Sequence, residues 1–319
     1  MVYLYALDNA VLPLVSGYYM NDSTIVVAGA TGNLGGRIAR ALCEGGAGVR
    51  ALVRRDTAPD KLERLQELGV TIASVDFSNT HQVAEACTGA SCVVSALAGL
   101  ADVMVGTQSV LLDAAVEAGV TRFIPSDFSI DFTMFPPGEN RNLDLRRDFH
   151  KRLDQAPIQA TTIFNGGFTE LLTGQMPLIL FKLQRVLSWG SADQRMDFTT
   201  RDNTATFTAC AALDPSTPRF LHIAGDRISA RELAAVVSEV TGKQFRLFRP
   251  GGLRMLGVLI KVARTFAPGE KELYPAWQGM QYMRNMFDGR AELEPLDNLR
   301  YPGIRWSTAR DVLSAHQVC

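Results

Sequence analysis

Short apolar runs alternate with amphipathic segments over the first half of the chain. The runs are rich in β-branched residues, and apolar residues recur with the helical period in the segments between them. Strands that are apolar throughout and separated by helices are typical of a parallel sheet covered on both faces. The sequence therefore predicts a doubly wound α/β fold. The expected strands are residues 24–29, 48–54, 70–77, 91–97, 121–126 and 160–165, and the expected helices are residues 34–44, 60–68, 80–87 and 106–118.

The regular alternation stops after Asn165, and the segments that follow are irregular. Ser229 and Glu232 have the spacing of a capping box, which predicts the start of a helix. We expect this second half to be a smaller α+β lobe over the carboxyl edge of the sheet, with part of the chain returning to the sheet. The expected division is an N-terminal extension over residues 1–19, a sheet domain over residues 20–165 and the smaller lobe over residues 166–319.

Composition and charge narrow the classes of function. Of the 319 residues 47% are hydrophobic, which is enough for a large core. Lys and Arg total 32 and Asp and Glu total 33, so the formal net charge is -1. This balance gives no electrostatic reason to expect nucleic acid or an anionic membrane as a partner.

The first twenty residues are apolar, but their pattern does not favour export. They lack a basic start and contain Asp8 and Pro13, unlike a secretory signal peptide. No other segment has the roughly 18 uninterrupted apolar residues of a membrane span. The five cysteines contain no CxxC pair. We therefore expect a cytoplasmic protein.

The stretch VVAGATGNLGG, residues 26–36, joins the first expected strand to the first expected helix. The free N–H groups at a helix N-terminus bind anions, and the pyrophosphate of a dinucleotide is the common ligand in this setting. We expect Gly29 to permit the tight turn, Gly32 to let the phosphates approach, and Gly35 to let the helix pack closely on the strand. The alternative is a tight turn with no ligand. Further expected contacts are Thr31, Asn33 and Leu34.

A basic residue follows the second expected strand. Arg54 lies nineteen residues after Gly35, where an NAD site usually has an acidic residue for the ribose hydroxyls. Arg54, with Arg55 beside it, would bind a 2′-phosphate through its planar guanidinium, which favours NADP(H). Asp56 keeps NAD(H) possible, because an error of one residue in the alignment would make Asp56 the acidic residue that contacts the ribose hydroxyls. At the end of the third strand, the expected adenine contacts are Asp76 and Phe77.

Four segments in order, GATGNLGG, LVRR, VVSALAG and VTRFIPSDFSID, resemble one family. They are similar to the atypical short-chain dehydrogenase/reductases of the NmrA-like and isoflavone-reductase-like group, over roughly residues 24–168. The resemblance implies a Rossmann fold that binds NADP(H), with a substrate-binding second lobe. It implies that the phosphoribose and nicotinamide lie along Ala96, Leu97, Ala98 and Gly99, above Pro125 and Ser126, and that the pocket closes at Asn165, Gly166, Gly167 and Phe168.

Aromatic residues near this pocket indicate a small apolar or aromatic substrate, although each is equally plausible as a core residue. They are Phe128, Phe132, Phe135 and Phe168.

The catalytic residues are harder to predict. None of the seven tyrosines has a lysine four residues later, so the usual tyrosine–lysine pair of short-chain reductases is absent. The resemblance places the family's lysine position at Arg146, which holds its proton but would polarise a carbonyl. His150, one helical turn later, or a water would supply the proton, and Lys151 is the fallback if the alignment shifts. A solvated charged helix face is the alternative.

Two functions remain open. The first is an NADPH-dependent reductase that transfers hydride to a carbonyl, imine or activated double bond. The second is an NmrA-like regulator that binds NADP(H) without turnover and reports redox state to a partner protein. A hydrolase is disfavoured because the sequence has no GxSxG elbow or HExxH helix. Either a monomer or a homodimer is compatible with the sequence.

Overall fold

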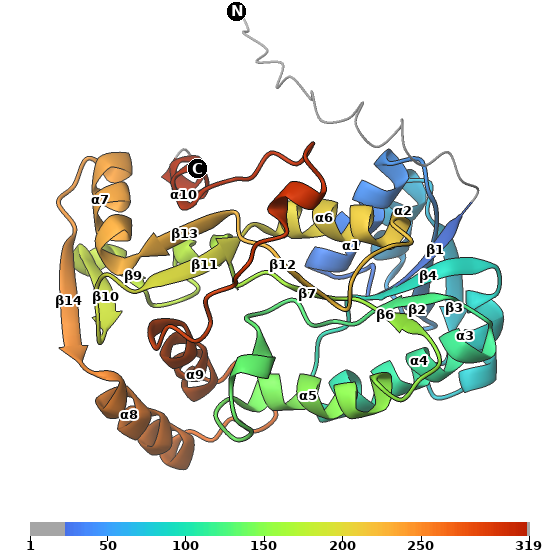
Figure 1. The fold of residues 1–319 in the computed structure, drawn as a ribbon, viewed down its shortest axis with the longest axis horizontal. Coiled ribbons are helices and arrows are strands. Elements are labelled where there is room, and N and C mark those ends of the chain that lie inside the picture. The colour runs from blue at the N-terminus through green and yellow to red at the C-terminus, as the bar shows by residue number, and fades with distance from the viewer. Residues whose placement is uncertain (1–22, 318–319) are drawn as a thin grey trace, which may run out of the picture.

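The computed structural model describes residues 23–317, so the expected extension over residues 1–19 lies outside the described residues. A six-stranded sheet forms the centre of the first half, with every neighbouring pair parallel and the order β3-β2-β1-β4-β5-β6 (Figure 1). The chain builds outward from β1 in one direction and then in the other, which confirms the doubly wound Rossmann fold. The strands are β1 Thr24–Ala28, β2 Gly48–Arg54, β3 Thr71–Val75, β4 Ala90–Ser95, β5 Arg122–Ile124 and β6 Gln159–Ala160.

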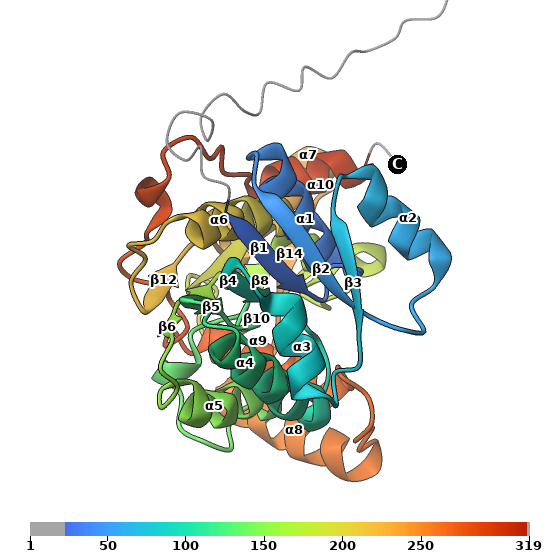
Figure 2. The same cartoon turned by 90° about the vertical axis from the view of Figure 1, so that its right-hand side faces the viewer.

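Helices cover both faces of this sheet (Figure 2). In β1, Ile25 and Val27 pack toward α1 and α6, whereas Val26 and Ala28 pack toward α3, α4 and α5. All four side chains are fully buried, which explains why this strand is apolar from Ile25 to Ala28. The helices are α1 Asn33–Glu44, α2 Pro59–Glu67, α3 Thr80–Cys87, α4 Gln108–Glu117, α5 Arg141–Leu153 and α6 Arg201–Leu213.

The fourth helix begins earlier than the pattern predicts. A π-helical segment over Asp102–Thr107 leads directly into α4, whereas we expected the helix to start at residue 106. The predicted start was too late because the helical spacing of apolar residues reveals only the part of the helix that packs on the sheet. The buried Gln108 side chain at the junction donates to the Met104 carbonyl and accepts from the Ser126 backbone N–H.

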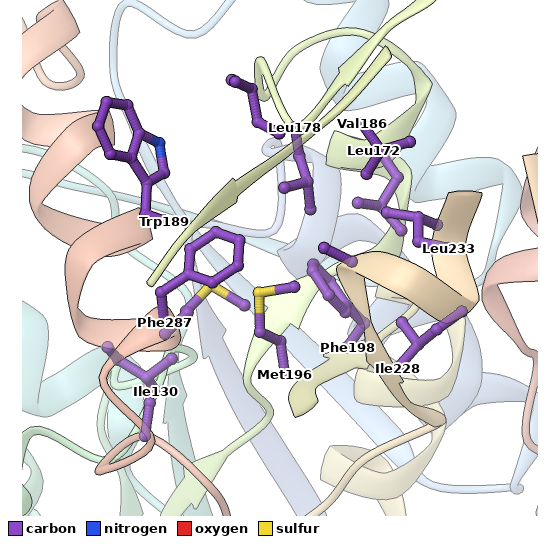
Figure 3. Packing of buried hydrophobic residues seen from close by; sticks show 14 of the residues in the cluster. Ile130, Leu172, Leu178, Val186, Trp189, Met196, Phe198, Ile228, Leu233 and Phe287 are labelled. Carbon is purple, nitrogen blue, oxygen red and sulfur yellow. The ribbon is translucent and has the colours of Figure 1, made fainter. Parts of the chain in front are cut away.

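The smaller lobe is built from short strands in two three-stranded sheets, ordered β14-β10-β9 and β13-β11-β8. Its core includes Trp189, Met196, Phe198 and Phe287, and Ile130 from the segment after β5 joins it (Figure 3). The strands are β8 Gly167–Phe168, β9 Ile179–Leu180, β10 Arg185–Trp189, β11 Arg195–Thr199, β13 Asp226–Ser229 and β14 Arg246–Gly251. The helices are α7 Ala230–Thr241, α8 Leu253–Phe266, α9 Ala276–Phe287 and α10 Ala309–Gln317.

The second half also returns to the first. Helix α6 packs on α1, and the strand β12, Phe220–His222, pairs in parallel with β7, Thr162–Phe164, which continues the line of β6. The carboxylate of Asp214, just after α6, accepts hydrogen bonds from Arg300 and from the Tyr301 hydroxyl of the C-terminal segment. The segment before α10 is thereby held against the sheet domain.

Candidate functional site

The glycine turn after β1 has no room for side chains at two of its positions. Gly29 has a φ of +87°, and a Cβ on it would lie 2.5 Å from the Ala96 carbonyl oxygen. A Cβ on Gly35 would lie 2.2 Å from the Gly29 carbonyl oxygen. Both distances are far below a normal contact, so the strand, the turn and α1 meet through bare backbone. This is the geometry that the spacing of the glycines predicts.

The N-terminus of α1 has no internal cap. Gly32 at the N-cap has no side chain, and the first turn contains no acidic residue. Backbone N–H groups in the first turn of a helix have no partner within the helix, so this end presents donors and a positive dipole. Asn33 is exposed and accepts a hydrogen bond from Arg37, Leu34 is half-buried, and Thr31 is half-buried in the turn. The bare, tightly packed turn fits a pyrophosphate.

The basic position after β2 is accessible. The Arg54 side chain is 78% exposed, and its Nε lies 3.7 Å from a carboxylate oxygen of Asp56. Such an exposed pair is weak, so the Arg54 guanidinium is available to a ligand. Because β2 lies beside β1 in the sheet, Arg54 ends at the same edge as the glycine turn.

The residues predicted to contact adenine are partly engaged by the protein. One carboxylate oxygen of Asp76 accepts hydrogen bonds from the Ser78 hydroxyl, at 2.7 Å, and from its backbone N–H, at 2.9 Å. These bonds, with a smaller effect from the charge of Arg55, lower the pKa of Asp76. Phe77 is half-buried against the core on the α3 and α4 face. Their contact with adenine stays a prediction.

The segments after β4 and β5 lie beside the glycine turn. The Ala96 N–H donates to the Ala28 carbonyl at the end of β1, 2.8 Å away. The Ser126 hydroxyl donates to the Leu97 carbonyl at 2.7 Å, so the two segments are joined directly. Ala98 follows in the same segment. Ligands of open α/β sheets bind at this carboxyl edge, where the strand order changes direction.

Asn165 has an unusual environment after β7. It is fully buried, and its backbone N–H donates to the Ser129 carbonyl while its carbonyl accepts from the Thr199 hydroxyl. Among the described residues, neither the oxygen nor the nitrogen of its side-chain amide has a hydrogen-bond partner. Leaving such groups unsatisfied costs about 1–3 kcal/mol each, so the free amide fits a polar group of a bound ligand.

Phe168 lies close to Arg201, a residue that the sequence did not indicate. The guanidinium carbon of Arg201 stands 5.0 Å from the centre of the Phe168 ring. Arg201 also pairs with Glu170, whose carboxylate accepts the Arg201 backbone N–H at 2.8 Å. Arg201 begins α6 and is distant from Phe168 in the chain, so local spacing carried no signal of the contact.

Arg146 lies in α5 and is half-buried. One of its terminal nitrogens donates to the Asn142 carbonyl, whereas its buried Nε has no partner among residues 23–317. Tyr282 of α9 lies near it: burial raises the pKa of Tyr282 to about 12, and the charge of Arg146 acts in the opposite direction. Arg146 is therefore held between α5 and α9 with one N–H still unsatisfied.

His150 and Lys151, the other two candidates, have different surroundings. Lys151 is exposed and pairs with Asp148 at 2.7 Å. His150 is buried, with Nε2 lying 2.6 Å from an Asp127 carboxylate oxygen and Nδ1 lying 2.9 Å from a terminal nitrogen of Arg219. Because a guanidinium only donates, Nδ1 is the acceptor and Nε2 carries the proton. Neither ring nitrogen is free for a substrate, so proton transfer by His150 stays a prediction that requires one of these bonds to break.

The buried pair of His150 and Asp127 is part of a larger network. The Thr162 hydroxyl donates to the same Asp127 oxygen at 2.8 Å and accepts from Arg219, also at 2.8 Å. Asp127 follows Ser126 directly, so the network fixes the turn that carries Ser126. Asp127 and Arg219 carry no local signal in the sequence, because they come from separate segments that only the fold brings together.

The aromatic residues predicted to line a pocket are mostly core. Phe128, Phe132 and Phe135 are buried, and Phe132 packs edge-on against Phe164 with ring centres 5.3 Å apart. Phe168 is the only one of the four that is not buried.

Metal binding and membrane spanning find no support between residues 23 and 317. No group of three or more histidine, cysteine, aspartate or glutamate side chains gathers there as a metal site. No helix in that range is both long and apolar enough to cross a membrane.

Burial raises the pKa of Cys92 to about 12, which leaves this thiol unreactive.

Comparisons with known proteins agree with this geometry. The chain is 30% identical over 239 residues to "Isoflavone reductase homolog IRL" of Zea mays, covering 70% of this chain and 76% of that protein. It is 28% identical over 241 residues to "Pinoresinol reductase 1" of Arabidopsis thaliana, covering 69% and 75%.

Two solved structures contain the expected cofactor. "AtPrR2 with NADP+ and (+)pinoresinol" matches with a TM-score of 0.80 at 21% identity, over 93% of this chain and all of that one. The leucoanthocyanidin reductase–NADPH complex from Vitis vinifera matches with a TM-score of 0.76 at 19% identity, over 93% and 100%. A model of the NmrA-like family matches residues 21–252, which is well over half of the sequence. The chain therefore belongs to the NmrA-like family.

Proposed function

We propose that this protein is an NADPH-dependent reductase of a small apolar or aromatic substrate. The observation that carries the proposal is the glycine turn, in which bare backbone at the N-terminus of α1 lies at the same sheet edge as the exposed Arg54. The turn accommodates a pyrophosphate, and the guanidinium selects the 2′-phosphate of NADP(H) over the free hydroxyl of NAD(H). Relatives named as isoflavone and pinoresinol reductases support this assignment.

The bound cofactor would supply a hydride, and the protein would position it. Ser126 and the segment Ala96–Ala98 form the floor on which the nicotinamide would lie, and the free amide of Asn165 would bind a polar group of nicotinamide or substrate. Phe168, with Arg201 over its ring, would contact the substrate from the smaller lobe.

Arg146 would stabilise negative charge that develops on the substrate oxygen. Its unsatisfied Nε supports this role, and its permanent charge means that it does not donate the proton. We propose that water supplies the proton, because both ring nitrogens of His150 are bound by protein groups.

A non-catalytic NADP(H)-binding regulator is the second candidate. Two observations favour it: arginine stands where the family resemblance expects lysine, and His150 is not free to carry a proton. In this case the cofactor site would be the same, and the difference would lie only in turnover.

NADPH consumption, followed by its absorbance, over a panel of aromatic ketones and enones separates the two functions. We expect turnover with at least one substrate. Arg146→Lys should retain or raise that turnover, and the control Arg152→Lys, on the exposed face of the same helix, should leave it unchanged. Tight NADPH binding with no turnover in either protein would favour the regulator, and no binding of NADPH would exclude both.

The domain boundaries and the cellular location are also proposals. We propose that the cofactor domain spans residues 20–165, that the substrate lobe spans residues 166–319, and that the protein acts in the cytoplasm. Limited proteolysis with and without NADPH would test the division, since the cofactor should protect the first part.

A further inference from the structure

Helix α8 carries an apolar stripe that no other part of residues 23–317 covers. It lies at the edge of the smaller lobe, between β14 and α9 (Figure 1). One face packs inward through the buried side chains of Leu256 and Ile260. A second apolar row points outward within an arc of about 100° around the helix. It consists of Met255, Val258, Leu259, Val262 and Phe266, which are 37–84% exposed.

The segment of chain that contains this stripe is strongly basic, although one of its cations, Arg264, packs over the Trp277 ring at 5.1 Å. Residues 240–269 contain six lysine or arginine residues and no aspartate or glutamate. All six are exposed, and none of them forms a salt bridge within the described range. The carboxylates that flank this stretch are Glu239, which pairs with Arg310, and Glu270 and Glu272, which follow the end of α8. The six residues are Lys243, Arg246, Arg249, Arg254, Lys261 and Arg264.

The whole-chain charge of -1 conceals this local excess. The total alone gives no electrostatic reason to expect an anionic membrane, because it averages this segment with the rest of the chain. A helix with exposed apolar side chains beside a basic cluster has the composition of an interfacial helix that lies on a membrane surface. The apolar stripe would enter the boundary of the lipid chains, and the cations would pair with anionic headgroups.

A second copy of the chain fits this surface less well. A symmetric contact through α8 would bring the same basic cluster on both copies together, and like charges oppose association. Five side chains of one helix also provide far less than the roughly 800 Å² per partner of a stable interface. We propose that α8 is a peripheral docking surface for an anionic phospholipid membrane. This inference is independent of the proposed reductase function.

Sedimentation of the full chain with lipid vesicles tests the proposal. We expect binding to vesicles of phosphatidylcholine mixed with phosphatidylserine, much weaker binding to phosphatidylcholine alone, and a loss of binding as salt increases. Arg254→Gln with Lys261→Gln should lower the partition coefficient roughly fivefold for each cation removed. Val258→Ser with Val262→Ser should lower it by roughly tenfold or more.

Matched controls separate α8 from general surface effects. Lys61→Gln removes an exposed cation from α2, and Leu299→Ser removes an apolar side chain that is 87% exposed. Both should bind vesicles as the unaltered chain does. All changed positions are exposed, and thermal unfolding of each variant checks that the fold is retained.

Three outcomes would overturn the proposal. The first is that the unaltered chain sediments with neither kind of vesicle. The second is that the control variants lose as much binding as the α8 variants. The third is that light scattering shows a dimer, which Val258→Ser with Val262→Ser converts to a monomer, because α8 would then be an interface between copies.

Discussion

Helices α1 and α7 begin in opposite ways. At α7, the Ser229 hydroxyl accepts the Glu232 backbone N–H at 3.2 Å, and the Glu232 carboxylate accepts the Ser229 N–H at 2.8 Å. At α1, Gly32 offers no side chain, so the first-turn donors remain available. The protein satisfies the end of α7 internally and presents the end of α1 to a ligand. A complete cap therefore marks a structural helix end, and a bare glycine turn at a sheet edge marks a candidate binding site.

The two regions around these helices are also built differently. The parallel sheet is buried by apolar packing on both faces. The smaller lobe has its own apolar core and also a largely buried carboxylate, Asp197, which pairs with Arg227 at 2.6 Å. Burial raises the pKa of Asp197, and the hydrogen bonds of Leu293 and Arg227 only partly offset this effect.

The glycine turn should be the most sensitive place in the molecule. We expect Gly35→Ala to destabilise the fold by about 3 kcal/mol or more, because its Cβ would overlap the Gly29 carbonyl. Gly279→Ala in α9, which has no atom within 4 Å of the added Cβ, should be neutral or slightly stabilising. Denaturant unfolding of both variants measures the difference, and equal losses would contradict the tight packing of α1 on the turn.

Removing the Arg54 guanidinium, at the same sheet edge, should weaken cofactor binding and leave the free energy of unfolding unchanged. We expect Arg54→Ala to weaken NADPH binding by about 1–3 kcal/mol, the size of a lost charge-assisted contact. NADH binding should hardly change. Calorimetric titration with both nucleotides measures this, with Arg40→Ala on the exposed face of α1 as the control. Equal losses for both nucleotides would mean that Arg54 has a structural role.

Acid should weaken the link between the two regions at Asp214. Burial opposes ionisation of this carboxyl, but hydrogen bonds from Ser216, Arg300 and Tyr301 outweigh it and lower the pKa to about 2. Because the folded-state pKa lies below the usual value near 4, the stabilisation is present above that pH and is lost as pH falls toward 2. It amounts to at most about 2.5 kcal/mol.

The matched variant is Asp214→Asn. We expect it to be less stable than the unaltered chain at neutral pH, with the gap narrowing between about pH 4 and pH 2. Chemical unfolding over this range measures the gap. A gap that is independent of pH would show that the charge of Asp214 is not the cause.

The smallest effect should come from the cap of α7. Ser229→Ala removes one of its two reciprocal hydrogen bonds and should cost about 1 kcal/mol of unfolding free energy. NADPH binding should not change, since α7 lies in the smaller lobe. A clear loss of NADPH affinity in this variant would undermine the contrast between the two helix ends.

The sequence by itself determined the features that depend on neighbouring residues. The apolar runs predicted the parallel sheet, although the run over residues 160–165 forms mostly β7, which pairs with β12 outside that sheet. The spacing of Gly29, Gly32 and Gly35 predicted the turn, and Ser229 with Glu232 predicted the start of α7. These features were accessible because strand burial, turn conformation and capping are settled within a few residues of the chain.

Only the tertiary structure decided the contacts between distant segments. His150 looked like a free proton carrier, but Asp127 and Arg219 reach both of its ring nitrogens from other elements. Helix α8 has apolar residues on two faces, and its sequence does not say which face is covered. Packing against the rest of the lobe buries Ile260 and leaves Val262 exposed. The physical reason is that exposure and pairing depend on what the fold places beside a residue, and local spacing does not contain that information.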